Sequence, residues 1–142
     1  PHMMMEYEGN IKETKTTIRD GFIYTGDIGV LDSNGFLSIT DRKKDVIFVK
    51  GFNVFPREIE ELLMSQSNIS AVCVVGKQDS RSGETPVAFI TLKTNVDISV
   101  IKKYCEDTML PYKVPSEFIV LENLPLTPAK KVDRVALKDR LI

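Results

Sequence analysis

The segment Ile69–Leu92, ISAVCVVGKQDSRSGETPVAFITL, decides the fold of most of the chain. It contains two mainly apolar runs, 69–75 and 87–92, joined by a polar stretch. In these runs apolar side chains occupy both alternating faces, which is typical of strands that are covered on both sides. The pattern predicts two strands that pair antiparallel in a sheet, with a loop at Gln78–Glu84.

Helix signals lie on both sides of these strands. Pro56 suits a first helical turn, and apolar residues follow it at helical spacing, which predicts a helix over about 56–66. Asp97 and Asp133 can each cap a later helix, the first of which ends before Pro111.

Short strand-like runs complete the domain. Val46–Val49 precedes the first helix, and Phe118–Leu121 follows the second. For the chain from Asp45 onward, these signals together predict an α+β fold with a small sheet of three to four strands and about three helices.

A β-hairpin is expected upstream of this domain. Two apolar segments flank the turn residues Asn34-Gly35, so strands are predicted near 28–31 and 36–40. The charged run Asp41–Asp45 follows the hairpin and is a candidate domain boundary.

The composition is that of an ordinary globular domain and limits the possible functions. Lys and Arg total 19 against 20 Asp and Glu in 142 residues, so no basic field attracts nucleic acid or anionic lipid. No apolar run approaches the roughly 20 residues of a transmembrane helix, and no secretory signal is recognisable. We therefore predict a cytoplasmic protein with no nucleic-acid partner and no transmembrane segment.

Cysteine and histidine usage argues against metal and disulfide sites. Cys73 and Cys105 lie far apart without CxxC spacing, so both are expected to be buried free thiols. The one histidine, His2, belongs to residues 1–4, which resemble a tag or cloning remnant. No metal site is predicted, and histidine-based catalysis lacks its central residue. Because the sequence has no glycine-rich phosphate loop, a nucleotide-using enzyme would need another segment to hold phosphates.

Several motifs follow one another along the chain. In order they are DGFIYTGD (20–27), DRKKD (41–45), GFNVFPREIE (51–60), YKVP (112–115) and LPLTPAKKVDRVAL (124–137). This series resembles the C-terminal third of the adenylate-forming superfamily of acyl-CoA synthetases, peptide-synthetase adenylation domains and luciferases. DRKKD and GFNVFPREIE look most similar to the fatty-acyl and aryl-acyl CoA ligases.

The resemblance implies the C-terminal domain of an ATP-dependent acid:CoA ligase. Such enzymes form an acyl-adenylate from a carboxylic acid and ATP with Mg²⁺, and then a thioester with CoA. Residues 5–43, including the hairpin, would be the end of a large N-terminal adenylation domain, and 44–142 a mobile lid. The expected partners are that N-terminal domain, the acid and CoA. The fragment alone is expected to be inactive and to bind no cofactor tightly.

Two residues match positions that bind ATP in the family. Asp27 matches a carboxylate that holds the ribose hydroxyls, and Arg42 matches an arginine that approaches the same ribose. Asp27 could instead cap a turn, and Arg42 could form a surface ion pair with Asp41 or Asp45.

Lys131 matches the catalytic lysine of the family, which reaches the substrate carboxylate and the α-phosphate. A cation there stabilises the negative charge of the transition state. The family usually has glycine just before this lysine, and Lys130 occupies that place here.

The remaining matched residues concern CoA and domain rotation. Lys50, Gly51 and Phe52 match the segment that lines the pantetheine tunnel, although Gly51 could merely serve the turn into the helix. Lys44 matches the hinge, although it could be one more solvated charge. The sequence leaves two alternatives open, namely an adenylation domain that loads a carrier protein and a stand-alone, non-catalytic α+β binding module.

Overall fold

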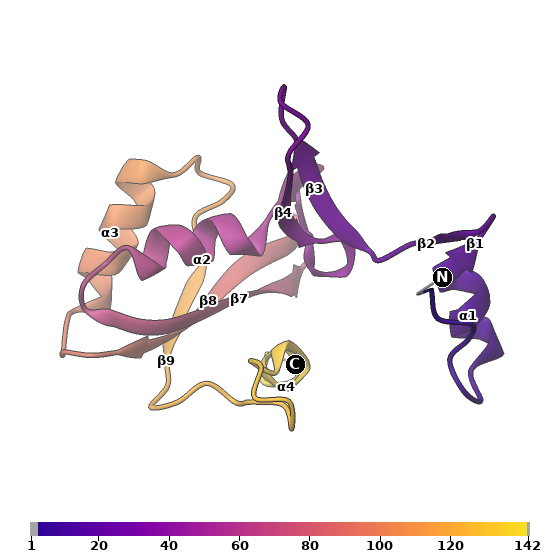
Figure 1. The fold of residues 1–142 in the computed structure, drawn as a ribbon. Helices are drawn as coiled ribbons and strands as arrows, with labels where there is room; N and C mark the ends of the chain where they lie inside the picture. The colour runs from indigo at the N-terminus through magenta and orange to yellow at the C-terminus, as the bar shows by residue number, and fades with distance from the viewer. Residues whose placement is uncertain (1–2, 142) are drawn as a thin grey trace. The chain divides into compact units, whose positions relative to one another are not determined.

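The computed structural model describes residues 3–141, whose backbone divides into two units (Figure 1). The first unit ends at Lys44 and the second begins at Asp45. A short 3-10 helix, η1 (Lys43–Asp45), spans the point of division. Residues 1–2 of the expected remnant lie outside the described residues.

The first unit consists of short elements with almost no core. It contains α1 (Ile11–Thr17), the two-residue strands β1 (Ile18–Arg19) and β2 (Phe22–Ile23), and the hairpin of β3 (Asp27–Leu31) and β4 (Leu37–Arg42). The predicted hairpin is therefore confirmed. In its turn, Asp32 Oδ1 accepts hydrogen bonds from the backbone N–H groups of Asn34 and Phe36, both at 2.8 Å.

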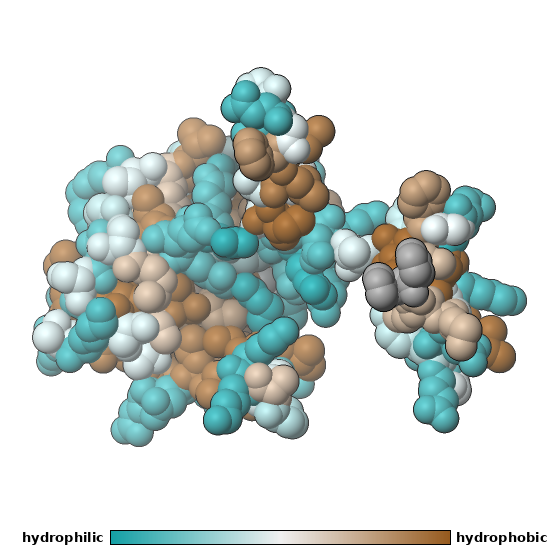
Figure 2. Space-filling view, in the orientation of Figure 1, coloured by the Kyte–Doolittle hydropathy of each residue, from teal (hydrophilic) through white to brown (hydrophobic). Residues whose placement is uncertain are grey.

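Several apolar side chains of this hairpin are exposed and are not covered by other residues of the first unit. Leu31, Phe36 and Leu37 are 67%, 71% and 65% exposed, and Figure 2 shows the hydrophobic residues along the hairpin. Asp41 is the one buried residue among the described residues up to Lys44. A segment that buries so little apolar surface cannot form a stable core by itself.

The second unit is built on a five-stranded sheet. Its strands are β5 (Ile47–Val49), β6 (Phe52–Val54), β7 (Ile69–Asp79), β8 (Gly83–Leu92) and β9 (Glu117–Val120). The order is β6-β5-β8-β7, and β9 pairs parallel to β8. β7 and β8 pair antiparallel, as predicted.

Helices cover both faces of this sheet (Figure 1). α2 (Pro56–Met64) and α3 (Ile98–Thr108) pack on one face through Ile59, Leu63, Ile101 and Cys105. α4 (Arg134–Asp139) packs on the other through Leu137. Alternating residues of β7 divide between the faces, since Val74 belongs to the first cluster and Cys73 and Val75 to the second. This two-sided burial explains the continuous apolar runs.

The predicted caps are present, and the α+β class is confirmed. Asp97 Oδ1 accepts from the Ser99 N–H at 2.9 Å, and Asp133 Oδ1 accepts from the Ala136 N–H at 3.0 Å. The predicted burial of Cys73 and Cys105 as free thiols is also confirmed. Burial raises the pKa of the Cys73 thiol to about 12 and that of Cys105 to about 11, so both stay protonated at neutral pH.

Two details of the predicted sheet are wrong. The sheet has five strands rather than three to four, because Phe52–Val54 pairs with β5 as β6. The loop expected at 78–84 is mostly strand, since Gln78 pairs with Glu84 and Asp79 with Gly83. A tight turn suffices because Asp79 Oδ1 accepts three hydrogen bonds, from the Arg81 N–H and from the N–H and hydroxyl of Ser82.

Among residues 3–141, no helix is long and apolar enough to cross a membrane.

Candidate functional site

Asp27 and Arg42 lie side by side across the hairpin of the first unit. They are register partners in β3 and β4, and Arg42 Nε lies 3.0 Å from Asp27 Oδ1. The arginine side chain is 56% exposed and the aspartate side chain 24% exposed. Arg42 thus forms an ion pair with Asp27, and its backbone N–H also donates to Asp41 Oδ1 at 2.7 Å. The ion pair uses one of the four lone-pair sites of the carboxylate, so Asp27 retains acceptor capacity.

Lys44 lies at the division between the units. It is exposed, it belongs to η1, and Asp45 is the first residue of the second unit. A short 3-10 helix is a common connector between elements and has poorer hydrogen-bond geometry than an α-helix. The position is compatible with the hinge role inferred from the motif.

Lys50 and Gly51 form the two-residue turn of the β5–β6 hairpin. Their φ angles are 51° and 85°, and Val49 pairs with Phe52 on either side. Two consecutive positive φ angles match a type I′ turn, which suits the twist of adjoining strands. Gly51 therefore serves a turn between strands rather than the turn directly into α2. A Cβ at Gly51 would meet nothing within 4 Å, so this side of the turn is open.

Phe52 follows this turn and presents an aromatic face. It is 54% exposed and stacks on Tyr112, with ring centroids 4.6 Å apart and planes 16° from parallel. The turn is held by Lys50, whose N–H donates to the Ser82 carbonyl at 2.8 Å. The segment Lys50–Phe52 is therefore an exposed but ordered edge.

Lys131 lies on a closed loop between Leu126 and Val132, which form a β-bridge. The Thr127 N–H donates to the Lys131 carbonyl at 2.7 Å, and the Lys130 N–H donates to the Thr127 carbonyl at 2.8 Å. The Thr127 hydroxyl accepts from the Lys131 N–H at 3.3 Å. The backbone of Lys131 is thus held, while its side chain is exposed and free to reach a ligand.

The backbone conformation of Lys130 accounts for the glycine that usually precedes the catalytic lysine in the family that the motifs resemble. Its φ is 58°, a left-handed conformation that glycine adopts without strain and other residues adopt at a cost. Lys130 therefore contributes its backbone conformation to this loop, and the neighbouring Lys131 is the better candidate for the catalytic cation.

This conformation predicts a contrast between two variants. Lys130→Val should destabilise the chain by about 1–2 kcal/mol, because a β-branched side chain is strained at positive φ. Lys130→Gly should leave stability unchanged within about 1 kcal/mol, since the relief of strain offsets the greater entropy of the unfolded chain. Urea unfolding of the 142-residue chain measures both. Equal stabilities of the valine and glycine variants would contradict the left-handed loop.

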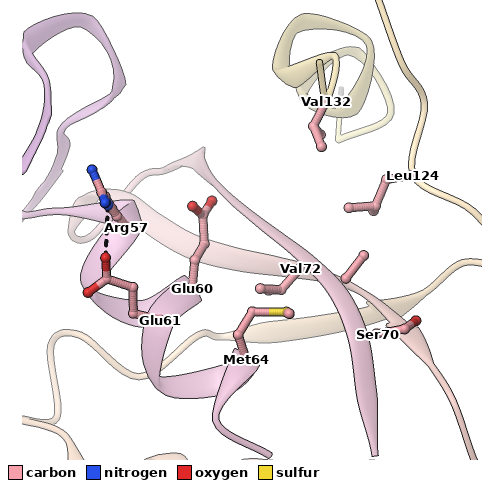
Figure 3. Close-up of a pocket in the computed structure, with 9 residues that line it drawn as sticks. Arg57, Glu60, Glu61, Met64, Ser70, Val72, Leu124 and Val132 are labelled. Atoms are coloured by element: carbon pink, nitrogen blue, oxygen red, sulfur yellow. Dashed lines mark hydrogen bonds and ion pairs between the residues drawn. The ribbon is translucent and has the colours of Figure 1, made fainter. Parts of the chain in front are cut away.

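A groove of about 480 Å³ lies elsewhere on the second unit, between α2, β7 and the loop that leads to α4 (Figure 3). Met64, Val72, Leu124 and Val132 give it an apolar lining, and Arg57 and Glu61 pair at its rim at 2.8 Å. None of the candidate ATP-binding, catalytic, hinge or CoA-binding residues named from the sequence lines it. Within residues 3–141 no cluster of His, Cys, Asp and Glu is suited to hold a metal ion.

Three side chains around these segments were not singled out from the sequence. Thr127 holds the Lys131 loop, Tyr112 supports Phe52, and Arg134 joins α4 to the sheet. All three lie inside the motifs quoted from the sequence, and those motifs could have pointed to them. Their contact partners could not be identified, because a motif marks a residue without indicating what it contacts.

Comparison with known proteins agrees with the motifs. Residues 58–131 match the AMP-binding enzyme C-terminal domain family, and the chain belongs to this family. It is 38% identical over 140 residues to a 2-succinylbenzoate–CoA ligase of Listeria innocua, covering 99% of this chain and 30% of that protein. It is 39% identical over 136 residues to a long-chain-fatty-acid–CoA ligase of Bacillus subtilis, covering 94% of this chain and 24% of that protein.

A solved structure shows the same similarity. The o-succinylbenzoate CoA synthetase of Bacillus subtilis, in complex with its acyl-adenylate intermediate, superposes with a TM-score of 0.88 at 34% identity. The match covers 96% of this chain and 28% of that one. The predicted resemblance to fatty-acyl and aryl-acyl CoA ligases is confirmed, and the chain spans less than a third of the length of these relatives.

Proposed function

We propose that this chain is the C-terminal part of an ATP-dependent acid:CoA ligase. In this proposal the whole enzyme forms an acyl-adenylate with release of pyrophosphate and then transfers the acyl group to the CoA thiol. The observation that carries the proposal is the loop of Lys131, in a chain of this family. Hydrogen bonds to Thr127 hold the backbone of this loop, and the loop presents the exposed side chain of Lys131.

The chemistry of adenylation requires such a cation. Negative charge gathers on the α-phosphate as the carboxylate attacks, and a positioned ammonium in a water-excluded site stabilises that charge. At about 4 Å and an effective dielectric constant near 20, an opposite unit charge contributes about 4 kcal/mol. We assign this role to Lys131.

Asp27 and Arg42 are proposed to bind the ribose of ATP. The carboxylate of Asp27 accepts hydrogen bonds from the two ribose hydroxyls, and the ion pair with Arg42 at 3.0 Å holds it in place. Lys50, Gly51 and Phe52 are proposed to border the pantetheine arm of CoA, because their turn offers open backbone and an exposed aromatic face.

The two units support the proposed division of the chain. We propose that residues 5–43 complete a larger N-terminal domain, because the exposed apolar side chains of the hairpin need a covering surface. Residues 44–142 then form the mobile lid, with Lys44 as its hinge. The partners of this chain are accordingly the N-terminal domain, a carboxylic acid and CoA, with Mg²⁺ bound together with ATP, and the enzyme works in the cytoplasm.

Two measurements test this function. The full-length protein should catalyse acid-dependent exchange of pyrophosphate into ATP and should form a CoA thioester. The 142-residue chain alone should do neither and should show no micromolar affinity for ATP in isothermal titration, since it lacks a phosphate-binding loop. Tight ATP binding by the isolated chain, or an inactive full-length protein, would refute the proposal.

A further inference from the structure

Arg134, the first residue of α4, joins three elements of the second unit. Its Nη1 donates to the Val74 carbonyl of β7 at 2.7 Å, and its Nη2 donates to Glu60 Oε1 of α2 at 2.7 Å. Its Nε lies 4.0 Å from Asp45 Oδ2. The side chains of Arg134, Glu60 and Asp45 are 28%, 16% and 18% exposed, so this is a largely buried cluster.

The cluster binds both backbone polar groups of Val74, on the edge strand β7. Glu60 Oε1 also accepts from the Val74 N–H at 2.8 Å, so the ion pair satisfies both backbone groups of Val74. Burial disfavours the guanidinium charge, but Glu60 and the other nearby acidic groups outweigh it, and the pKa of Arg134 lies above its usual value. The planar fork of arginine can serve the carbonyl and the carboxylate together, whereas lysine has a single nitrogen.

The position of Arg134 in the chain connects this cluster to the lysine loop. Arg134 follows Lys131 by three residues, and the Asp133 N–H between them donates to the Pro125 carbonyl at 2.8 Å. α4 spans only Arg134–Asp139, and Leu137 is its one buried residue. A helix this short is held by its tertiary contacts rather than by its own propensity. Arg134 is thus a polar anchor between α4, next to the segment that carries Lys131, and the sheet.

We propose that Arg134 is a positioning residue for adenylation, which fixes the base of the Lys131 loop to α2, β7 and the first residue after the hinge. This inference rests on the proposed function. Arg134 does not touch the reacting groups in this proposal. It acts only through Lys131, so replacing Arg134 should lower the rate of adenylation only when Lys131 is present.

A double-mutant cycle in the full-length protein tests this dependence. Arg134→Met should lower acid-dependent pyrophosphate exchange about tenfold to hundredfold, because misplacement by about 1 Å of a positioned group has effects of this size. Thioester formation from supplied acyl-adenylate should stay within about threefold of normal. In the Lys131→Ala background, Arg134→Met should cause less than about a threefold further loss of exchange.

Matched variants separate positioning from folding. Arg140→Met replaces an exposed arginine at the C-cap of the same helix, for which no side-chain hydrogen bond or ion pair is present among residues 3–141, and should leave both half-reactions unchanged. Arg134→Lys keeps the charge but has a single donor nitrogen, so it should fall between the wild type and Arg134→Met. It replaces the methionine variant if that variant does not fold. Equal losses in both half-reactions, no loss in either, or an undiminished loss in the Lys131→Ala background would overturn the proposal.

A measurement on the 142-residue chain is independent of activity. Arg134→Met should speed hydrogen exchange at the Lys130 and Lys131 amides about tenfold, while the amides of α3 keep their protection. Unchanged exchange at the two lysines would overturn the positioning role. If the loop loosens as expected but the parent enzyme shows no pyrophosphate exchange, the proposed function fails and the anchoring by Arg134 stands.

Discussion

Lys131→Ala in the full-length protein is expected to lower acid-dependent pyrophosphate exchange by a factor on the order of 10²–10³. The variant removes a cation that in our proposal meets charge developing on the α-phosphate, so it acts on the transition state of the first half-reaction. The Lys131 side chain is exposed, whereas its backbone is held by Thr127, so the substitution should leave the loop intact. Parallel kinetics of the two half-reactions measure the effect.

The second half-reaction serves as the control for this variant. Thioester formation from supplied acyl-adenylate should be nearly unchanged in Lys131→Ala, because the phosphate chemistry is already complete. Lys130→Ala should lower the exchange rate much less, since Lys130 supplies a left-handed backbone rather than a charge. A larger loss in Lys130→Ala than in Lys131→Ala would show that the assignment within this pair is wrong.

Lys44→Pro is expected to reduce thioester formation far more than adenylation. Proline fixes φ near −65° and also restricts Lys43, so a segment that must adopt two backbone conformations loses one of them. Lys44 lies in the 3-10 helix η1, and the φ range of such helices, about −50 to −70°, includes the φ of proline. Adenylation should therefore remain within about tenfold of normal, roughly 1.4 kcal/mol in the barrier. Separate assays of pyrophosphate exchange and thioester formation measure the difference.

The role of backbone freedom can be separated from the role of charge. Lys44→Ala removes the charge and keeps the conformational freedom, so it should have little effect on either half-reaction if Lys44 is the hinge. Equal losses in both half-reactions for Lys44→Pro, or none in either, would remove the hinge from this position.

The sequence by itself determined the types of most elements and their local pairing. Apolar runs on both alternating faces predicted β7 and β8, and helical spacing after Pro56 predicted α2. Asp97 and Asp133 predicted the starts of α3 and α4 because capping depends on residues within one turn of the helix. The family motifs also indicated the candidate site residues, because spacing along the chain is enough to recognise a motif.

Only the tertiary structure decided which distant residues meet. Lys113 binds Glu58 across 55 positions, and Arg134 binds Val74 across 60, at distances that no local pattern encodes. The parallel pairing of β9 with β8 and the short strand β6 were likewise outside the reach of periodicity. Periodicity reports which side of a segment is buried, but not the segment that buries it. The left-handed backbone of Lys130 is also a tertiary result, since the closed loop between Leu126 and Val132 imposes on a lysine a conformation that its own preference disfavours.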